Sequence, residues 1–335
     1  MSDPTTRSNS VANSVANPVA DGAASGAAND VTLSAQAEMV TVRVGLPWWQ
    51  LLARDPLALV SAVRLLFLIL CVAFGPELLG KEATSINLRA RNSPPGSLEK
   101  GWLMLLGADA LGRSMLARLV VASRNTLTVA FVSVVLAMVV GGVLGLIAGY
   151  IGRGIGNLIM RLSDVVQSFP SLLLAVIVLY MLEPRVSNLI IVLALTRVPS
   201  YLRVTRAEVL EIRERGFVDA ARSMGGSRTH ILWRHVVPVV APTLLTIMTV
   251  DFAIVMLAES GLSFLGIGIQ PPEITWGLMV AQGRNYLSQA WWLAFFPGLV
   301  IMSATLSANL LSNWLRLVTD PVQRWRLEAP RGQDD

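Results

Sequence analysis

Long apolar runs separated by short, mostly basic segments constrain the fold of this chain more than any other feature. The 335 residues are 53% hydrophobic and only 15% charged, whereas soluble domains carry about 25% charged residues. An α-helix needs about 20 mostly apolar residues to cross the hydrocarbon layer of a bilayer. The sequence therefore predicts an all-α, polytopic membrane protein.

The distribution of arginines predicts the topology. Between Arg197 and Arg234 there are eight arginines and four acidic residues, and such a basic excess marks the cytosolic side of a membrane protein. We expect six transmembrane helices with both termini in the cytosol, and a long external segment at residues 75–124. The six expected spans are residues 57–74, 126–150, 165–182, 186–202, 239–258 and 291–310.

Two of these spans carry features that need a partner. Arg64 in the first span is unfavourable at mid-bilayer depth. Either its side chain extends toward the cytosol, or the span starts later and reaches Leu79. In the second span, Gly141, Gly145 and Gly149 form a double GxxxG pattern, which predicts close packing against another helix.

Composition divides the chain into four parts. The first part is rich in small and polar residues and lacks an apolar core long enough for a signal peptide, so we expect a disordered cytosolic tail. Trp48 and Trp49 should then lie on an interfacial helix. The parts are residues 1–45; residues 46–124, with the interfacial helix, the first span and the external segment; residues 125–321, with five spans; and a cytosolic tail at 322–335. The third part includes a cytosolic loop at 206–237 and an external loop at 259–290.

The cytosolic loop contains an amphipathic helix. Its apolar residues recur at positions i, i+3, i+4 and i+7, so they share one helical face. These residues are Phe217, Ala220, Ala221 and Met224. Such a face with a basic rim is typical of a surface that docks into a partner's groove. Periodicity alone is equally compatible with an ordinary amphipathic loop.

A sharp turn should end this helix and start another. Gly225 and Gly226 follow it, as a helix C-cap requires. Ser227 can cap a second helix at residues 228–236, and we expect that helix to end before Pro238. The local prediction is a compact helix–turn–helix.

The same stretch resembles the EAA loop of ABC importer permeases, which reads E-A-A-x3-G-x9-I-x-L-P. Asp219 replaces the Glu of that pattern, His235 its Ile and Val237 its Leu. The matching positions are Ala220, Ala221, Gly225 and Pro238. By this resemblance the ATPase-coupling residues also include Phe217, Asp219, Met224 and Arg228.

The resemblance continues at residues 107–321. Residues 106–114 are similar to L-G-T-D-x-x-G-R-D, with Ala108 and Ser114 departing from it, and residues 169–174 are similar to F-P-x-L-L-L. The most specific match is residues 259–279, which nearly reproduce E-A-S-L-S-F-L-G-L-G-x-Q-P-P-x-x-x-W-G-x-M. Residues 309–321 also look like the family's C-terminal end. Together these matches point to the C-type permease subunit of dipeptide, oligopeptide and nickel importers.

This resemblance implies a type I ABC importer permease fold in the bacterial cytoplasmic membrane. The implied partners are a second, B-type permease, two cytosolic ATPase subunits, an extracytoplasmic binding protein and the lipid bilayer. Di- or oligopeptides are the implied cargo, and nickel, glutathione or an oligosaccharide are alternatives.

The sequence lacks the usual signatures of catalysis and of nucleotide or metal sites. It contains no G-x-x-x-x-G-K-[ST], HExxH, GxSxG or CxxC. Cys71 is the single cysteine, and His230 and His235 are five residues apart and do not stack on one helix face. The net charge of +5 is dispersed between apolar runs, so it does not indicate nucleic-acid binding. We expect a non-enzymatic chain without cofactor or metal, so an ATP-driven process needs a separate ATPase.

Asp251 lies inside the fifth expected span, where an ionised carboxylate facing lipid is unfavourable. It either lines the translocation path or bonds to a neighbouring helix. In an ion-coupled secondary transporter, the alternative function, it would bind the ion. The expected path residues are Asp251, Glu259, Gln270 and Trp276, and the external loop should form an outer vestibule with Thr275 accessible.

Overall fold

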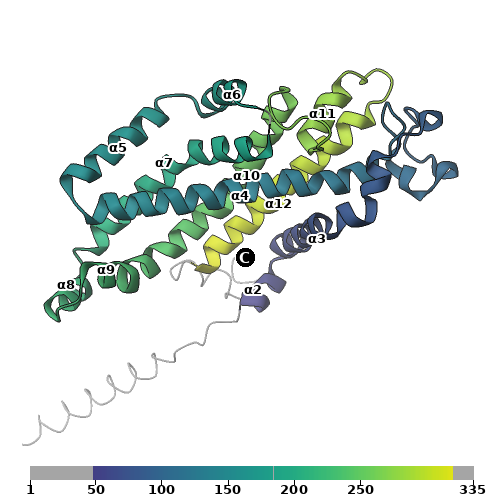
Figure 1. Ribbon diagram of the computed structural model, residues 1–335. Coiled ribbons are helices and arrows are strands. Elements are labelled where there is room, and N and C mark those ends of the chain that lie inside the picture. The colour runs from purple at the N-terminus through teal and green to yellow at the C-terminus, as the bar shows by residue number, and fades with distance from the viewer. Residues whose placement is uncertain (1–47, 184, 320–335) are drawn as a thin grey trace, which may run out of the picture. The chain divides into compact units, whose positions relative to one another are not determined.

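The computed structural model describes residues 48–183 and 185–319 (Figure 1). The tails at 1–45 and 322–335, and the expected C-terminal match at Asp320 and Pro321, lie outside the described residues. Within them the chain is helical, apart from one isolated bridge between Ala108 and Ser114.

The described elements follow one another in this order. They are α2 (Trp48–Arg54), α3 (Pro56–Thr84), three short 3₁₀ turns (Leu88–Ala90, Leu98–Lys100 and Trp102–Leu106), α4 (Met115–Tyr150), α5 (Arg153–Gln167), α6 (Ser171–Met181), α7 (Val186–Ile212), α8 (Gly216–Ser223), α9 (Arg228–Ile231), a π-helical turn (Leu232–Val236), α10 (Val237–Phe264), α11 (Trp276–Arg284) and α12 (Trp292–Thr319). The expected interfacial helix is α2, and the all-α prediction is confirmed.

Four of the described helices are long and apolar enough to cross a membrane. They are α3, α4, the continuous helix Arg228–Phe264 and α12. The pair α5 and α6 gives a fifth if it is counted as one bent span. The expected fourth span, α7, is not among them, and it carries Arg197 and Arg203. A multi-pass membrane protein is therefore clear, whereas the count of six spans stays a prediction.

The ends of the first two spans differ from the expected ones because capping groups fix them. Asp55 accepts hydrogen bonds from the backbone amides of Leu57 and Ala58, so α3 starts at Pro56 and runs through to Thr84. Ser114 accepts from the amide of Ala117, so α4 begins at Met115 rather than at Thr126.

Arg64 of α3 has a polar partner that neither expected arrangement included, and the choice between the two arrangements stays open. It lies inside a helix that extends past Leu79, and it donates to the hydroxyl of Ser303 on α12. The guanidinium thus has a polar partner within the described chain.

The third expected span, residues 165–182, is interrupted at Pro170, and α6 starts directly after that proline. Residues 153–167 form a separate amphipathic helix, α5, and α6 follows it at an angle of 86°. Pro170 explains the break, since the residue before a proline is disfavoured in the helical region and proline itself lacks an N–H. The exposed apolar side chains of α5 lie at helical spacing: Ile155, Leu158, Leu162 and Val165.

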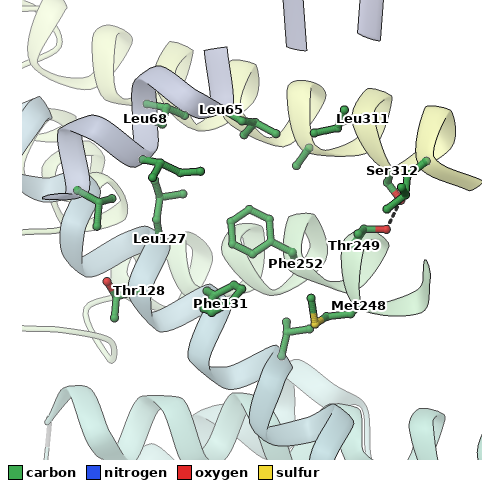
Figure 2. Close-up of a pocket in the computed structure, with 15 residues that line it drawn as sticks. Leu65, Leu68, Leu127, Thr128, Phe131, Met248, Thr249, Phe252, Leu311 and Ser312 are labelled. Atoms are coloured by element: carbon green, nitrogen blue, oxygen red, sulfur yellow. Dashed lines mark hydrogen bonds between the residues drawn. The ribbon is translucent and has the colours of Figure 1, made fainter. Parts of the chain in front are cut away.

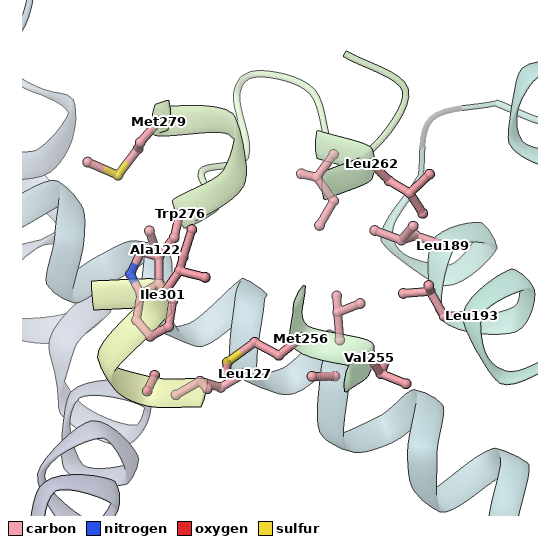
Figure 3. Packing of buried hydrophobic residues seen from close by; sticks show 14 of the residues in the cluster. Ala122, Leu127, Leu189, Leu193, Val255, Met256, Leu262, Trp276, Met279 and Ile301 are labelled. Atoms are coloured by element: carbon pink, nitrogen blue, oxygen red, sulfur yellow. The ribbon is translucent and has the colours of Figure 1, made fainter. Parts of the chain in front are cut away.

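Helix α4 is the centre of the described bundle. Helices α3, α7 and α10 contact it, and α12 contacts α3, α10 and α11. The main hydrophobic core lies between these helices. It includes Leu127 of α4, Met256 of α10, Trp276 of α11 and Ile301 of α12 (Figure 3).

The predicted glycine stripe of α4 packs against α7. A Cβ atom added at Gly141 would lie 2.6 Å from Cβ of Tyr201, and one at Gly145 would lie 2.5 Å from Cβ of Thr205. At Gly149 the corresponding distance to Cβ of Val209 is 2.8 Å. Only glycine leaves room for the two backbones at this separation, which confirms the close-packing prediction.

Candidate functional site

The turn between α8 and α9 has the predicted caps. Gly225 has φ +82°, a left-handed conformation that glycine adopts without strain. Its amide donates to the carbonyl of Arg222 at 3.0 Å, and the amide of Gly226 donates to the carbonyl of Ala221 at 3.0 Å. These are the two bonds of a Schellman motif. Ser227 then caps α9 by accepting from the amide of His230 at 3.2 Å.

The predicted apolar face of α8 is divided between the interior and the surface. Ala221 is buried together with Val218, in a small cluster that also includes Val209, Ile212, Ile231, Val236 and Val240. Phe217, Ala220 and Met224 point outward, with 42% of Phe217 and 82% of Met224 exposed. We call these three residues the docking face. The inner residues hold α8 in place and leave the docking face free in the described chain.

A polar rim surrounds the docking face. Asp219, at the position of the expected Glu, pairs with Arg222 at 3.0 Å on the surface. A broad depression beside it has a volume of about 710 Å³ and is lined in part by Asp219, Arg222 and Arg228. A partner that covers the docking face and this depression would contact apolar and charged groups together.

The sequence predicts that the second helix ends before Pro238, and this prediction is wrong. A π-helical turn at Leu232–Val236 joins α9 to α10, so the helix continues from Arg228 to Phe264. Pro238 is the second residue of α10 and directly follows the π-helical turn, so the helix is widened at the point where proline cannot donate a backbone hydrogen bond. The wider π-helical turn joins the geometry of α9 to that of α10.

Asp251 lies on α10 and faces α7. Its carboxylate oxygen is 3.7 Å from a guanidinium nitrogen of Arg197, and only 6% of the residue is exposed. Arg197 was expected near the cytosol, but here it balances a carboxylate within the bundle. The geometry favours the reading in which Asp251 bonds to a neighbouring helix.

The other expected path residues lie near the junction of α10 and α11: Glu259 is on α10, Gln270 is in the connection, and Trp276 is the first residue of α11. Glu259 is fully buried and accepts from the hydroxyl of Ser263 at 2.8 Å. The indole N–H of Trp276, also fully buried, donates to the carbonyl of Leu119 at 2.9 Å. Gln270 is half-buried and donates to the carbonyl of Gly266 at 2.9 Å. Glu259 and Trp276 thus lie inside the packing of this chain.

Thr275 is not accessible, contrary to expectation. It is fully buried and caps α11 by accepting from the amide of Leu278 at 3.2 Å. The exposed residues of the connection before α11 are Leu265, Gly266, Pro271, Pro272 and Glu273.

A charged cluster that sequence reasoning missed lies at the N-terminal end of α4. Asp109 accepts from Nε of Arg113 at 2.7 Å and from Nη1 of Arg118. Arg118 is 3% exposed, and its Nη2 donates to the side-chain oxygen of Gln282 on α11 at 3.1 Å. Burial raises the pKa of Asp109, but the guanidinium of Arg118 and the hydrogen bonds from Arg113 outweigh it, so the net pKa is lowered. The signal was present in the sequence as an aspartate and two arginines within ten residues.

A strongly apolar cavity between four of the long helices is unsuited to a peptide. It has a volume of about 500 Å³ and lies among α3, α4, α10 and α12, where Leu65, Leu127, Phe131 and Phe252 line it (Figure 2). The hydroxyls of Thr249 and Ser312 at its edge are 2.8 Å apart and bond to each other. Peptide N–H and C=O groups would find few partners there.

Comparisons with known proteins place this chain in a family. The model described as "Binding-protein-dependent transport system inner membrane component" matches residues 141–323. The di/tripeptide transport system permease protein DppC of Pseudomonas aeruginosa is 36% identical over 275 residues, which cover 82% of this chain and 91% of that protein. The probable D,D-dipeptide transport system permease protein DdpC of Escherichia coli is 33% identical, with 81% and 89% covered.

Two further matches extend the comparison. The glutathione transport system permease protein GsiD of Pectobacterium atrosepticum is 31% identical, with 82% of this chain and 91% of that protein covered. An inward-facing structure of the MetNI methionine ABC transporter matches 58% of this chain and 94% of its own, with 17% identity and a TM-score of 0.48. The extent of the family match and the identity to these relatives show that the chain belongs to the family of binding-protein-dependent transport system inner membrane components.

Proposed function

We propose that this chain is the permease subunit of an ATP-driven ABC importer that moves di- or oligopeptides across the cytoplasmic membrane. Family membership and the peptide-permease names of its relatives support the class and the cargo. The observation that carries the proposal is the docking face, an exposed apolar surface on a short helix with fixed caps at both sides of its turn.

The docking face would bind a groove of a separate ATPase subunit. Isolated apolar side chains are common on protein surfaces, but Phe217 and Met224 lie on one helix face beside a charged rim, as helix-in-groove recognition requires. Since the sequence has no phosphate-binding loop, nucleotide binding and hydrolysis belong to that partner. Two such ATPases would serve this chain and a second, B-type permease.

A single continuous helix connects the region of the docking face to the outer side. The continuous helix of 37 residues from Arg228 to Phe264 is about 55 Å long at 1.5 Å per residue. It starts next to the turn that follows the docking face and ends at the outer connection that contains Gln270. Closure of an ATPase pair would therefore move both sides of the bundle, as alternating access requires.

The path would lie between the two permeases, with an extracytoplasmic binding protein that delivers the cargo. Gln270 remains a candidate to contact it, while Glu259 and Trp276 would hold the outer connection in shape. Asp251 would act through its pair with Arg197. This pairing removes the free carboxylate that the secondary-transporter alternative needs.

The test uses Met224→Glu in the co-expressed complex. Met224 is 82% exposed, so the change spares the fold but places a charge in the apolar contact. We expect normal membrane insertion, with ATPase co-purification weakened by about tenfold or more. Leu88→Glu is the matched control, since Leu88 is 67% exposed in the segment between α3 and α4, outside the candidate membrane spans. A wild-type chain that retains no ATPase, or a Met224→Glu chain that retains it fully, would refute the assignment.

The cargo is tested separately by competition. Purified importer in proteoliposomes should take up a labelled dipeptide only with ATP and the binding protein. Unlabelled peptides should compete, and nickel, glutathione or an oligosaccharide should not. Competition by glutathione alone would shift the assignment to the cargo named for the Pectobacterium relative.

A further inference from the structure

A small cavity with charged residues in its wall lies beside the charged cluster at the N-terminal end of α4. Its volume is about 230 Å³, and Asp109, Arg113, Arg118, Gln282 and Tyr286 are among the residues that line it. The docking face lies near the other end of the bundle: Arg213, just before α8, donates to the carbonyl of Gly149 at the C-terminal end of α4. The 36 residues of α4 separate the two by about 54 Å. The cavity and the docking face are therefore on opposite sides (Figure 1).

The charges around this cavity do not balance. Two guanidinium groups, from Arg113 and Arg118, face one carboxylate, from Asp109, so the cluster carries one excess positive charge. Arg118 is 3% exposed, and a buried charge of this kind normally has a full set of partners.

The hydrogen-bond donors of the cluster are also incompletely used. Nε of Arg118 is buried and has no partner among the described residues. Arg113 uses only its Nε and its backbone amide, toward Asp109, within the described part of the chain. Its side chain is 21% exposed, so its terminal nitrogens can be reached from outside. An anion with two acceptor oxygens matches such a set of guanidinium donors.

We propose that this cavity binds a carboxylate group presented from the extracytoplasmic side. Two sources have this chemistry: the C-terminal carboxylate of a peptide cargo, and an acidic side chain of the binding protein. The direction of approach rests on the proposed function, whereas carboxylate binding itself does not.

The decisive variant is Gln282→Glu. The oxygen of Gln282 already accepts from Arg118, so glutamate at this position fits the same space and strengthens the contact. It also supplies an internal carboxylate that neutralises the excess charge. A purely structural cluster would be unaffected or stabilised by this change, whereas a binding site would be blocked. Gln289→Glu adds the same charge at an exposed position of the α11–α12 connection and serves as the matched control.

The first measurement is independent of transport. The thermal unfolding temperature of the purified chain is compared in sodium acetate and in sodium chloride at equal ionic strength. We expect acetate to raise it in the wild type and in Gln289→Glu, but not in Gln282→Glu. An acetate effect that is missing from the wild type, or equal in all three proteins, would overturn the proposal.

The second measurement identifies the source in the assembled importer. Gln282→Glu should reduce uptake by about tenfold, the effect of losing one charged contact, while Gln289→Glu should transport normally. A loss confined to peptides with a free C-terminus, with amidated peptides unaffected, assigns the site to the cargo. A loss of ATPase stimulation by the binding protein in the absence of peptide assigns it to the binding protein. Wild-type uptake by Gln282→Glu would contradict both assignments, and an inactive wild type would instead count against the proposed function.

Discussion

The guanidinium of Arg197 on α7 lies 3.7 Å from the carboxylate of Asp251 on α10, within a bundle whose other contacts are largely apolar. Each charge alone would be unfavourable at that depth, and together they neutralise each other. Their separation is longer than a tight ion pair, and Oδ2 of Asp251 has no regular hydrogen bond within the described residues. The pair therefore fixes the relation of two helices more than it adds stability.

Asp251→Asn should destabilise the protein by about 1–3 kcal/mol, because it leaves the half-buried guanidinium of Arg197 without a counter-charge. The double variant Asp251→Asn with Arg197→Gln should recover part of that loss. Thermal unfolding in detergent of the wild type, Asp251→Asn, Arg197→Gln and the double variant measures the coupling between the two residues. Additive effects would mean that the pair does not interact, and unchanged transport with an unchanged pH profile in Asp251→Asn would exclude a role for its charge in the path.

Gly225→Val should leave the protein in the membrane but abolish transport and ATPase association. No atom lies within 4 Å of a Cβ added at this glycine, so the penalty comes from the backbone, whose φ of +82° a branched residue adopts at a cost of about 1–3 kcal/mol. Gly225→Asn is the control, since asparagine tolerates this conformation. Uptake and co-purification of the two variants are compared. Equal activity of Val and Asn would remove the turn from the coupling surface.

Gly145→Ala should destabilise the bundle by about 1–3 kcal/mol, because the new methyl group would lie 2.5 Å from Cβ of Thr205. Gly154→Ala on α5 is the matched control, as its Cβ would meet nothing within 4 Å. That variant should be neutral or slightly stabilised. Thermal unfolding in detergent compares them, and similar behaviour would show that α4 and α7 can separate freely.

The stability contribution of Asp109 should depend on pH in one direction. Its pKa is lowered in the folded protein from the ordinary value of 3.8, so its contribution is complete above that value and is lost as the pH falls through the lower folded-state pKa. The wild type should therefore lose more stability than Asp109→Asn between about pH 5 and pH 2. Parallel unfolding curves for the two proteins across that range would contradict the assignment of the ion cluster.

Cysteine at Ser288 should react with a membrane-impermeant thiol reagent from outside, since Ser288 is exposed in the connection between α11 and α12. Cysteine at the fully buried Thr275 should react poorly from either side. Both are made in a Cys71→Ala background, because Cys71 is the only native cysteine. Labelling of position 288 only from the cytosolic side would invert the expected topology.

Local chemistry made one part of the site predictable. Gly225, Gly226 and Ser227 act through bonds to residues three to five positions away, so the sequence alone indicated the caps. The α4 glycine stripe was also readable, because its spacing defines a helix face. The direction of the α8 face was not, since Val218 and Phe217 are neighbours and only the packing decides which is buried.

Contacts between distant segments escaped the sequence for a different reason. Arg197 and Asp251 pair because α7 and α10 are neighbours, and Arg118 meets Gln282 because α11 returns to α4. No periodic pattern encodes which helices are adjacent. A break at Pro170 was predictable, because proline interrupts a helix, but the amphipathic helix α5 before it was not expected.

The glycine stripe of α4 limits how this bundle can change shape. Glycine occupies three positions of α4 that face Tyr201, Thr205 and Val209. The side chains of α7 therefore fit into the gaps that these glycines leave along α4. Sliding one helix along the other would drive a side chain of α7 into the ridge between two glycines. Shear between these helices is thus blocked, and α4 with α7 must travel as one rigid rod. Any rearrangement that opens one side of the membrane and closes the other must take place around this rod.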